Sequence, residues 1–146
     1  DNPFAGRVIC ESCGRVFGRK VWNSTSEKLR RIVWQCNGKY LAKGEKGCGS
    51  RHIDDGVLYQ AFVDVFNAMV EQKSYFLEKW QKSLASNNVL VQYKARQFIR
   101  ILTEAMVIKE FDVNLYFALT EKITVYENGR LMVSLLDGTD IECEIE

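Results

Sequence analysis

The sequence has no apolar run of the roughly 18 residues that a membrane-spanning helix needs. Its first residues, Asp1–Phe4, show neither the basic nor the apolar region of a secretory signal, and no Met stands at position 1. Internal repeats and low-complexity stretches are also missing. We therefore expect no membrane span and no secretory leader, and we predict a segment of a longer cytoplasmic chain.

Groups that carry out catalysis are equally scarce. His52 is the single histidine, and no serine or cysteine forms a recognisable pair with a base. Ser24–Ser26 reads as a turn, and the glycines from Gly38 to Gly49 do not match the phosphate-binding G-x-x-x-x-G-K-[ST] motif. We therefore expect no enzymatic activity and no small-molecule substrate for this chain.

Charge is unevenly distributed. The 20 Lys and Arg and 19 Asp and Glu give a net charge of +1, but residues 1–52 contain 11 basic against 4 acidic residues. Residues 53–146 contain 9 against 15. A basic N-terminal third indicates a polyanionic partner, usually nucleic acid, and the alternative is an ordinary solvated surface.

Four of the five cysteines lie close together in the sequence. Cys10 and Cys13 are separated by two residues, and Gly14 can adopt the left-handed conformation that closes such a turn. Cys36 and Cys48 can supply two more thiolates. Because no secretory context favours disulfides, we predict one structural, four-coordinate Zn²⁺ per chain, bound by Cys10, Cys13, Cys36 and Cys48.

Three alternatives for this cluster remain open. The thiols could simply be buried side chains, or Cys10 and Cys13 could form a redox dithiol. His52 could also replace Cys48 as the fourth ligand. The distant Cys143 is expected to be a small buried hydrophobic residue.

Residues 1–52 are predicted to form a zinc β-ribbon. Short strand-like runs cover Arg7–Ile9, Val16–Trp22 and Leu29–Gln35, with a turn at Asn23–Ser26. We expect Trp22 and Trp34 to be core residues of the ribbon. The basic residues that we predict to contact nucleic acid are Arg15, Arg19, Lys20, Lys28, Arg30, Arg31, Lys39, Lys43 and Lys46.

Residues 53–146 are predicted to form a helical hairpin followed by an antiparallel β-meander. Apolar residues recur at helical spacing over Val57–Leu84, Val89–Lys109 and Val113–Lys122. The spacing then changes to period two, with type I′ turns expected at Asn128–Gly129 and Asp137–Gly138. The whole is an α+β chain, in which 1–52 and 53–146 pack as one compound domain. The sequence leaves open whether the meander pairs with the ribbon.

The order of these residues resembles a known family. The segments that carry the resemblance are Asn2–Gly6, Val8–Gly14, Ile32–Cys36, Cys48, Val125–Leu131 and Leu136–Thr139. Together they resemble the zinc β-ribbon region of large serine recombinases, the phage integrases and transposon-encoded recombinases of the resolvase type. The resemblance covers both ends of the chain and is vague in the middle.

The resemblance implies a role in DNA integration or transposition. It implies that Cys10, Cys13, Cys36 and Cys48 match the metal ligands of the family, and that the partners are double-stranded DNA and other recombinase subunits, as a dimer or tetramer. Those recombinases cut DNA with a serine in a separate domain, so this chain should not cut DNA by itself. A bacterial, nucleoid-associated location is also implied.

The middle of the chain departs from the family pattern. The family often carries a long coiled coil here, but residues 70–110 are too few for sustained heptads and contain Asn87–Asn88 at their centre. An alternative hypothesis is a zinc-stapled interaction module that contacts other subunits. It draws on the aromatic residues Tyr59, Phe62, Phe66, Tyr75, Phe76 and Trp80, if part of that set is exposed.

Overall fold

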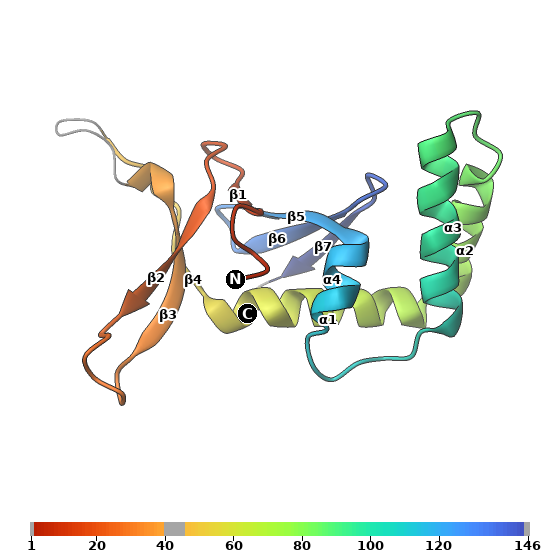
Figure 1. Ribbon diagram of the computed structural model, residues 1–146. Helices are drawn as coiled ribbons and strands as arrows, with labels where there is room; N and C mark the ends of the chain where they lie inside the picture. The colour runs from red at the N-terminus through yellow and green to blue at the C-terminus, as the bar shows by residue number, and fades with distance from the viewer. Residues whose placement is uncertain (1, 40–45, 145–146) are drawn as a thin grey trace.

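The computed structural model describes residues 2–39 and 46–144, which form two β-sheets and four α-helices (Figure 1). This confirms the predicted α+β class. None of the described helices is both long and apolar enough to cross a membrane. The elements are β1 (Val8–Cys10), β2 (Phe17–Trp22), β3 (Arg31–Cys36), the 3₁₀ turn η1 (Asn37–Lys39), β4 (Ile53–Asp54), α1 (Asp55–Glu71), α2 (Lys73–Ser83), α3 (Val89–Glu104), α4 (Val113–Leu119), β5 (Thr120–Val125), β6 (Arg130–Leu135) and β7 (Asp140–Glu144).

The ribbon is an antiparallel sheet in the order β2-β3-β4. Strands β2 and β3 pair from Phe17 opposite Cys36 to Trp22 opposite Arg31, as the sequence predicts. Asn23 begins the turn with a φ of 56°, a conformation that Asn tolerates better than most residues. In Figure 1 this hairpin projects from one end of the molecule.

The two ribbon tryptophans have different environments. Trp34 is buried, and its indole Nε1 donates a hydrogen bond to Asp55 Oδ1 at 2.8 Å. Trp22 is only half-buried, because it lies on the opposite face of the sheet, where the Arg31 guanidinium and the His52 ring pack against it. The prediction of a core position is therefore wrong for Trp22.

The predicted β-meander is present as β5, β6 and β7, and β1 extends it in the order β1-β5-β6-β7. Val8–Cys10 runs parallel to Ile123–Val125, so the meander pairs directly with the first strand of the chain. Strand β4 starts at Ile53 and pairs with β3. Both pairings join residues on the two sides of position 52, and the division into 1–52 and 53–146 stays a prediction.

The hairpin turns differ from the predicted type. Only the glycines take a positive φ, 83° at Gly129 and 90° at Gly138, whereas a type I′ turn needs two such residues. Asn128 and Asp137 instead use their side-chain oxygens to accept hydrogen bonds from the amides of Arg130 and Thr139. In each turn the glycine is therefore the single left-handed residue.

Helix α1 covers one face of the meander. Its buried residues, among them Leu58, Phe62 and Phe66, share one hydrophobic cluster with Leu131 and Val133 of β6. The N-terminal Phe4, which is fully buried, is inserted into the same cluster. The aromatic rings around Phe4 belong to Trp34, Tyr59, Phe111 and Tyr116.

The predicted single helix over Val57–Leu84 is wrong, because the chain bends at Gln72 between α1 and α2. The helical hairpin consists of α2 and α3 alone, and it stands at a steep angle to α1 (Figure 1). Lys73 at the start of α2 donates hydrogen bonds to the carbonyls of Thr103 and Ala105, which ties the bend to the end of α3. Helix α4 ends at Leu119 rather than Lys122, because Thr120 already belongs to β5.

The hairpin rests on the turn between β6 and β7. Trp80 Nε1 donates a hydrogen bond to Asp137 Oδ2 at 3.0 Å, and Lys94 Nζ donates one to the Leu136 carbonyl at 3.1 Å. Phe62, Phe66, Phe76 and Trp80 are buried, so of the aromatic residues in the alternative hypothesis only Tyr75 is well exposed. The apolar residues exposed near the tip are instead Leu84, Val89, Leu90, Val91 and Tyr93.

Candidate metal centre

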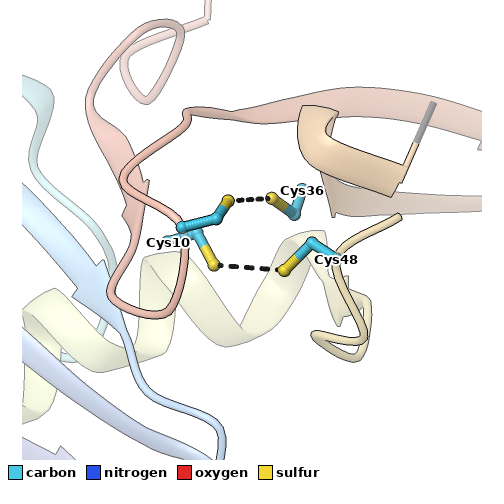
Figure 2. Close-up of side chains that lie close together, drawn as sticks. Cys10, Cys36 and Cys48 are labelled. Atoms are coloured by element: carbon cyan, nitrogen blue, oxygen red, sulfur yellow. Dashed lines mark hydrogen bonds between the residues drawn. The ribbon is translucent and has the colours of Figure 1, made fainter. Parts of the chain in front are cut away.

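The four N-terminal cysteines meet at one point between the two sheets. Their sulfur atoms all lie within 4.8 Å of one another. Cys10 is the last residue of β1 and Cys13 follows in the adjoining turn, whereas Cys36 ends β3 and Cys48 lies in the loop before β4. Figure 2 shows two sulfurs of the first turn facing Cys36 and Cys48 across this gap, with Cys10 opposite Cys48. Two segments far apart in sequence thus contribute two sulfurs each.

Backbone geometry aims the sulfurs inward. In the first turn the Gly14 amide donates a hydrogen bond to the Cys10 carbonyl at 2.8 Å, and Gly14 has a φ of 76°. In the second turn the Gly38 amide donates to Cys36 Sγ at 3.3 Å, and the Cys48 amide donates to the Gly38 carbonyl at 3.0 Å. A side chain at Gly38 would collide with the cluster, since its Cβ would lie 3.1 Å from Cys13 Sγ.

The sulfur positions fit a tetrahedral ion. Four sulfurs at about 2.3 Å from a central Zn²⁺ are separated by about 3.8 Å. Cys10 Sγ lies 3.7 Å from Cys48 Sγ, and Cys13 Sγ lies 3.3 Å from Cys36 Sγ. An all-thiolate donor set is the one that Zn²⁺ accepts in closed structural sites, in which no coordination position remains for a substrate. The residues present therefore suit a structural ion and would supply it with four ligands.

The protein environment shifts the pKa values of the thiols in different directions. Burial raises the pKa of the Cys36 thiol to about 12, whereas the hydrogen bond from the Arg15 backbone lowers the pKa of Cys13 to about 7. The hydrogen bond from the Ser50 hydroxyl lowers the pKa of Cys48. A buried thiol such as Cys36 needs a nearby positive charge to ionise at neutral pH, and a coordinated divalent cation provides it.

Sequence reasoning missed one residue at this centre. Ser50 is 5% exposed, and its Oγ lies 3.1 Å from Cys10 Sγ and 3.2 Å from Cys48 Sγ. A serine two residues after a cysteine carries no recognisable signal by itself. Only the folded loop before β4 shows that this hydroxyl points at two sulfurs.

The competing candidates lie elsewhere. His52 packs against Trp22 with ring centroids 4.7 Å apart, and the group of potential metal ligands among the described residues does not include it. Cys143 is in β7 and is half-buried, packed against the core, which is less buried than predicted. None of the five cysteines, all of which lie in the described part of the chain, forms a disulfide.

The predicted nucleic-acid contacts are distributed along the ribbon. Arg19 and Lys20 lie on β2, whereas Lys28 and Arg30 lie in the exposed turn between β2 and β3. The other four described residues, Arg15, Arg31, Lys39 and Lys46, lie at or beyond the ends of β2 and β3, and Lys43 is outside the described residues.

Arg31 has an acidic partner within the ribbon. Its Nε and Nη2 atoms donate hydrogen bonds to the two Asp54 carboxylate oxygens at 2.7 and 2.9 Å. This pair links β3 to β4 on the ribbon surface and lowers the pKa of Asp54. Part of the Arg31 charge is therefore already compensated within the ribbon.

Comparison with known proteins gives two matches. Residues 3–67 match the family model described as the recombinase zinc beta ribbon domain. A chain in a solved structure titled "Crystal Structure of a LSR-DNA Complex", a large serine recombinase, matches with a TM-score of 0.51 and 16% identity. The match covers 93% of this chain and 56% of that chain, so the present chain spans about half of that recombinase. No curated protein matches the sequence.

These matches confirm two predictions. Residues 3–67 match the zinc-ribbon domain of recombinases, which agrees with the predicted N-terminal zinc ribbon and with the predicted resemblance to the zinc-ribbon region of large serine recombinases. At 16% identity, the likeness to the solved recombinase concerns the fold.

Replacing one ligand should remove the metal. We expect the unmodified chain to bind one equivalent of zinc and Cys13→Ser to lose it, because three thiolates leave a closed site incomplete. The loss should cost at least about 3 kcal/mol, or roughly 10 °C in Tm. Elemental analysis and thermal unfolding followed by circular dichroism measure both effects. Cys143→Ser is the control, and a Cys13→Ser variant that kept its zinc would contradict the assignment.

Gly38→Ala should weaken the same centre from the backbone side. The added Cβ would lie 3.1 Å from Cys13 Sγ and 3.3 Å from Cys36 Sγ, so these sulfurs must move. We expect a loss of about 1–3 kcal/mol in the free energy of unfolding and weaker zinc retention. Gly49→Ala is the matched control, because a Cβ there meets no atom within 4 Å. Equal behaviour of the two variants in urea unfolding would show that Gly38 is not needed for close packing.

Proposed function

We propose that this chain is the DNA-binding zinc-ribbon region of a large serine site-specific recombinase and that it recognises attachment-site DNA. The observation that carries the proposal is a basic β-hairpin whose base is fixed by four clustered cysteines. The recombinase-type family match over residues 3–67 and the fold shared with a recombinase solved in complex with DNA support it. We further propose that the ion is Zn²⁺ and that its role is structural.

The charge of the ribbon suits a phosphate backbone. Four thiolates exceed the charge of one Zn²⁺, but residues 1–52 stay positive because their 11 basic residues outnumber 4 acidic ones. Arg19, Lys28 and Arg30 are exposed on β2 and on the following turn. A two-stranded ribbon fits the width of the major groove, where Arg and Lys reach both phosphates and base edges.

A rigid base is what makes such a hairpin useful. Binding loses free energy when flexible segments must be ordered, and a hairpin held by metal and by β4 is ordered in advance. The Arg31–Asp54 pair adds a further link between β3 and β4. The proposed role of the centre is therefore to present the basic turn in a fixed direction.

We propose that the cutting chemistry belongs to a separate domain of the parent recombinase. In that arrangement this chain supplies affinity for DNA in integration or transposition, and other recombinase subunits assemble around the same site. The cytoplasmic, nucleoid-associated location follows from this role.

DNA binding should fall steeply with salt. We expect fluorescence anisotropy with an attachment half-site to show that the logarithm of the binding constant falls linearly with the logarithm of the salt concentration. The magnitude of this slope should decrease by about 0.9 for each phosphate contact removed. The affinity for DNA and the magnitude of this slope should both fall in Arg19→Ala, Lys28→Ala and Arg30→Ala. Lys79→Ala on α2, far from the ribbon, should change neither (Figure 1). No binding even at low salt, or equal binding by all four variants, would refute the proposal.

The second candidate is a zinc-stapled module that contacts other subunits. The exposed Val89, Leu90 and Tyr93, at 72%, 67% and 55% exposure, favour it because apolar side chains gather there near the tip of the α2–α3 hairpin. We expect sedimentation to show concentration-dependent association that Leu90→Glu abolishes. A monomer at all concentrations, with intact DNA binding, would leave only the first function.

A further inference from the structure

We propose that Ser50 is a positioning residue of the metal centre. Its hydroxyl donates a hydrogen bond that the Cys10 and Cys48 thiolates share, and this bond slows the loss of the ion. The inference rests on the proposed metal centre and is independent of DNA binding.

The Ser50 hydroxyl is buried and lies close to two of the four sulfurs. Its Oγ is nearly equidistant from two sulfurs, 3.1 Å from Cys10 and 3.2 Å from Cys48. The residue is 5% exposed, so water does not compete freely for the hydroxyl. Cys10 belongs to the first turn and Cys48 to the second, so one side chain bridges the two halves of the centre.

The chemistry fixes the direction of this hydrogen bond. A metal-bound cysteine is a thiolate and has no proton to donate, so the serine hydroxyl must be the donor. Because the hydroxyl has one proton, it can donate to both sulfurs only through one shared hydrogen bond or by alternating between them. Hydrogen bonds to charged acceptors are the stronger kind, and they reduce the electron density that the sulfur offers to other reagents.

Ser50 complements a backbone donor on the other side of the cluster. The Gly38 amide donates to Cys36 Sγ at 3.3 Å, and Cys36 forms a close sulfur pair with Cys13. The Ser50 hydroxyl contacts the other close pair, Cys10 and Cys48. Groups that support metal ligands in this way typically change metal affinity about 10- to 100-fold when they are removed.

The test compares serine-to-alanine changes at two positions of the same centre. Ser50→Ala removes the buried hydroxyl, and Ser12→Ala removes an exposed one between Cys10 and Cys13. On the complete 146-residue chain, zinc affinity and release are measured by competition with a chromogenic chelator at fixed pH. We expect Ser50→Ala to bind zinc about tenfold more weakly and to release it faster, and Ser12→Ala to match the unmodified chain.

A spectroscopic measurement separates positioning from general destabilisation. In the Co²⁺-substituted protein, the sulfur-to-cobalt charge-transfer band should move to longer wavelength in Ser50→Ala, because the thiolates lose a hydrogen bond. The pair Ser50→Thr and Ser50→Val, equal in shape but different in the hydroxyl, repeats the comparison if the alanine variant fails to fold. Thr should resemble the unmodified chain and Val should resemble alanine.

The outcomes distinguish a failure of the proposed role of Ser50 from a failure of the metal centre or of DNA binding. If the unmodified chain binds zinc and the Ser50 variants show unchanged affinity, release and cobalt spectrum, the role of Ser50 is refuted while the metal centre stands. If the unmodified chain binds no metal, both fail. If DNA binding fails but the metal measurements come out as expected, only the proposed DNA-binding function is lost.

Discussion

The cluster of four sulfurs is the constraint on which the rest of the molecule depends. Cys10 ends a strand of the β1-β5-β6-β7 sheet and Cys13 follows it, whereas Cys36 ends one strand of the ribbon sheet and Cys48 lies in the loop before the next. An ion held between them would join the two sheets at this point. The ribbon packs on the core through Phe17 and Trp34, and the ion would further fix the direction in which its basic turn points.

Local patterns in the sequence were sufficient for most elements and for the four clustered cysteines. The alternation of Leu29–Gln35 and the helical spacing after Asp55 are properties of short segments, and both gave the right element type. The bend at Gln72 was not predictable in the same way, because neither Gly nor Pro marks it and the Lys73 hydrogen bonds that secure it come from α3. Trp22 shows the same limit: a ribbon has two faces, and only the rest of the fold decides which of them is covered.

The metal centre contains contacts that cannot be predicted from the sequence. Cysteine spacing indicates a metal because sulfur chemistry is specific to that residue type, whereas a serine hydroxyl has many uses. Ser50 becomes part of the centre only when the loop before β4 returns it to the Cys10 turn. The pairing of Arg31 with Asp54 is equally invisible in the charge count, although it changes how much of the ribbon's positive charge faces outward.

The parallel pairing of β1 with β5 has a consequence for how the protein is made. Val8–Cys10 finds its partner only at Ile123–Val125, more than a hundred residues later in the chain. Contacts so distant in sequence form slowly, because a long loop must close before they give any stabilisation. On the ribosome, the ribbon hairpin can form early from neighbouring residues, but β1 stays without its partner strand until residues 120–125 have emerged. The sheet that carries Cys10 is therefore completed later than the ribbon hairpin.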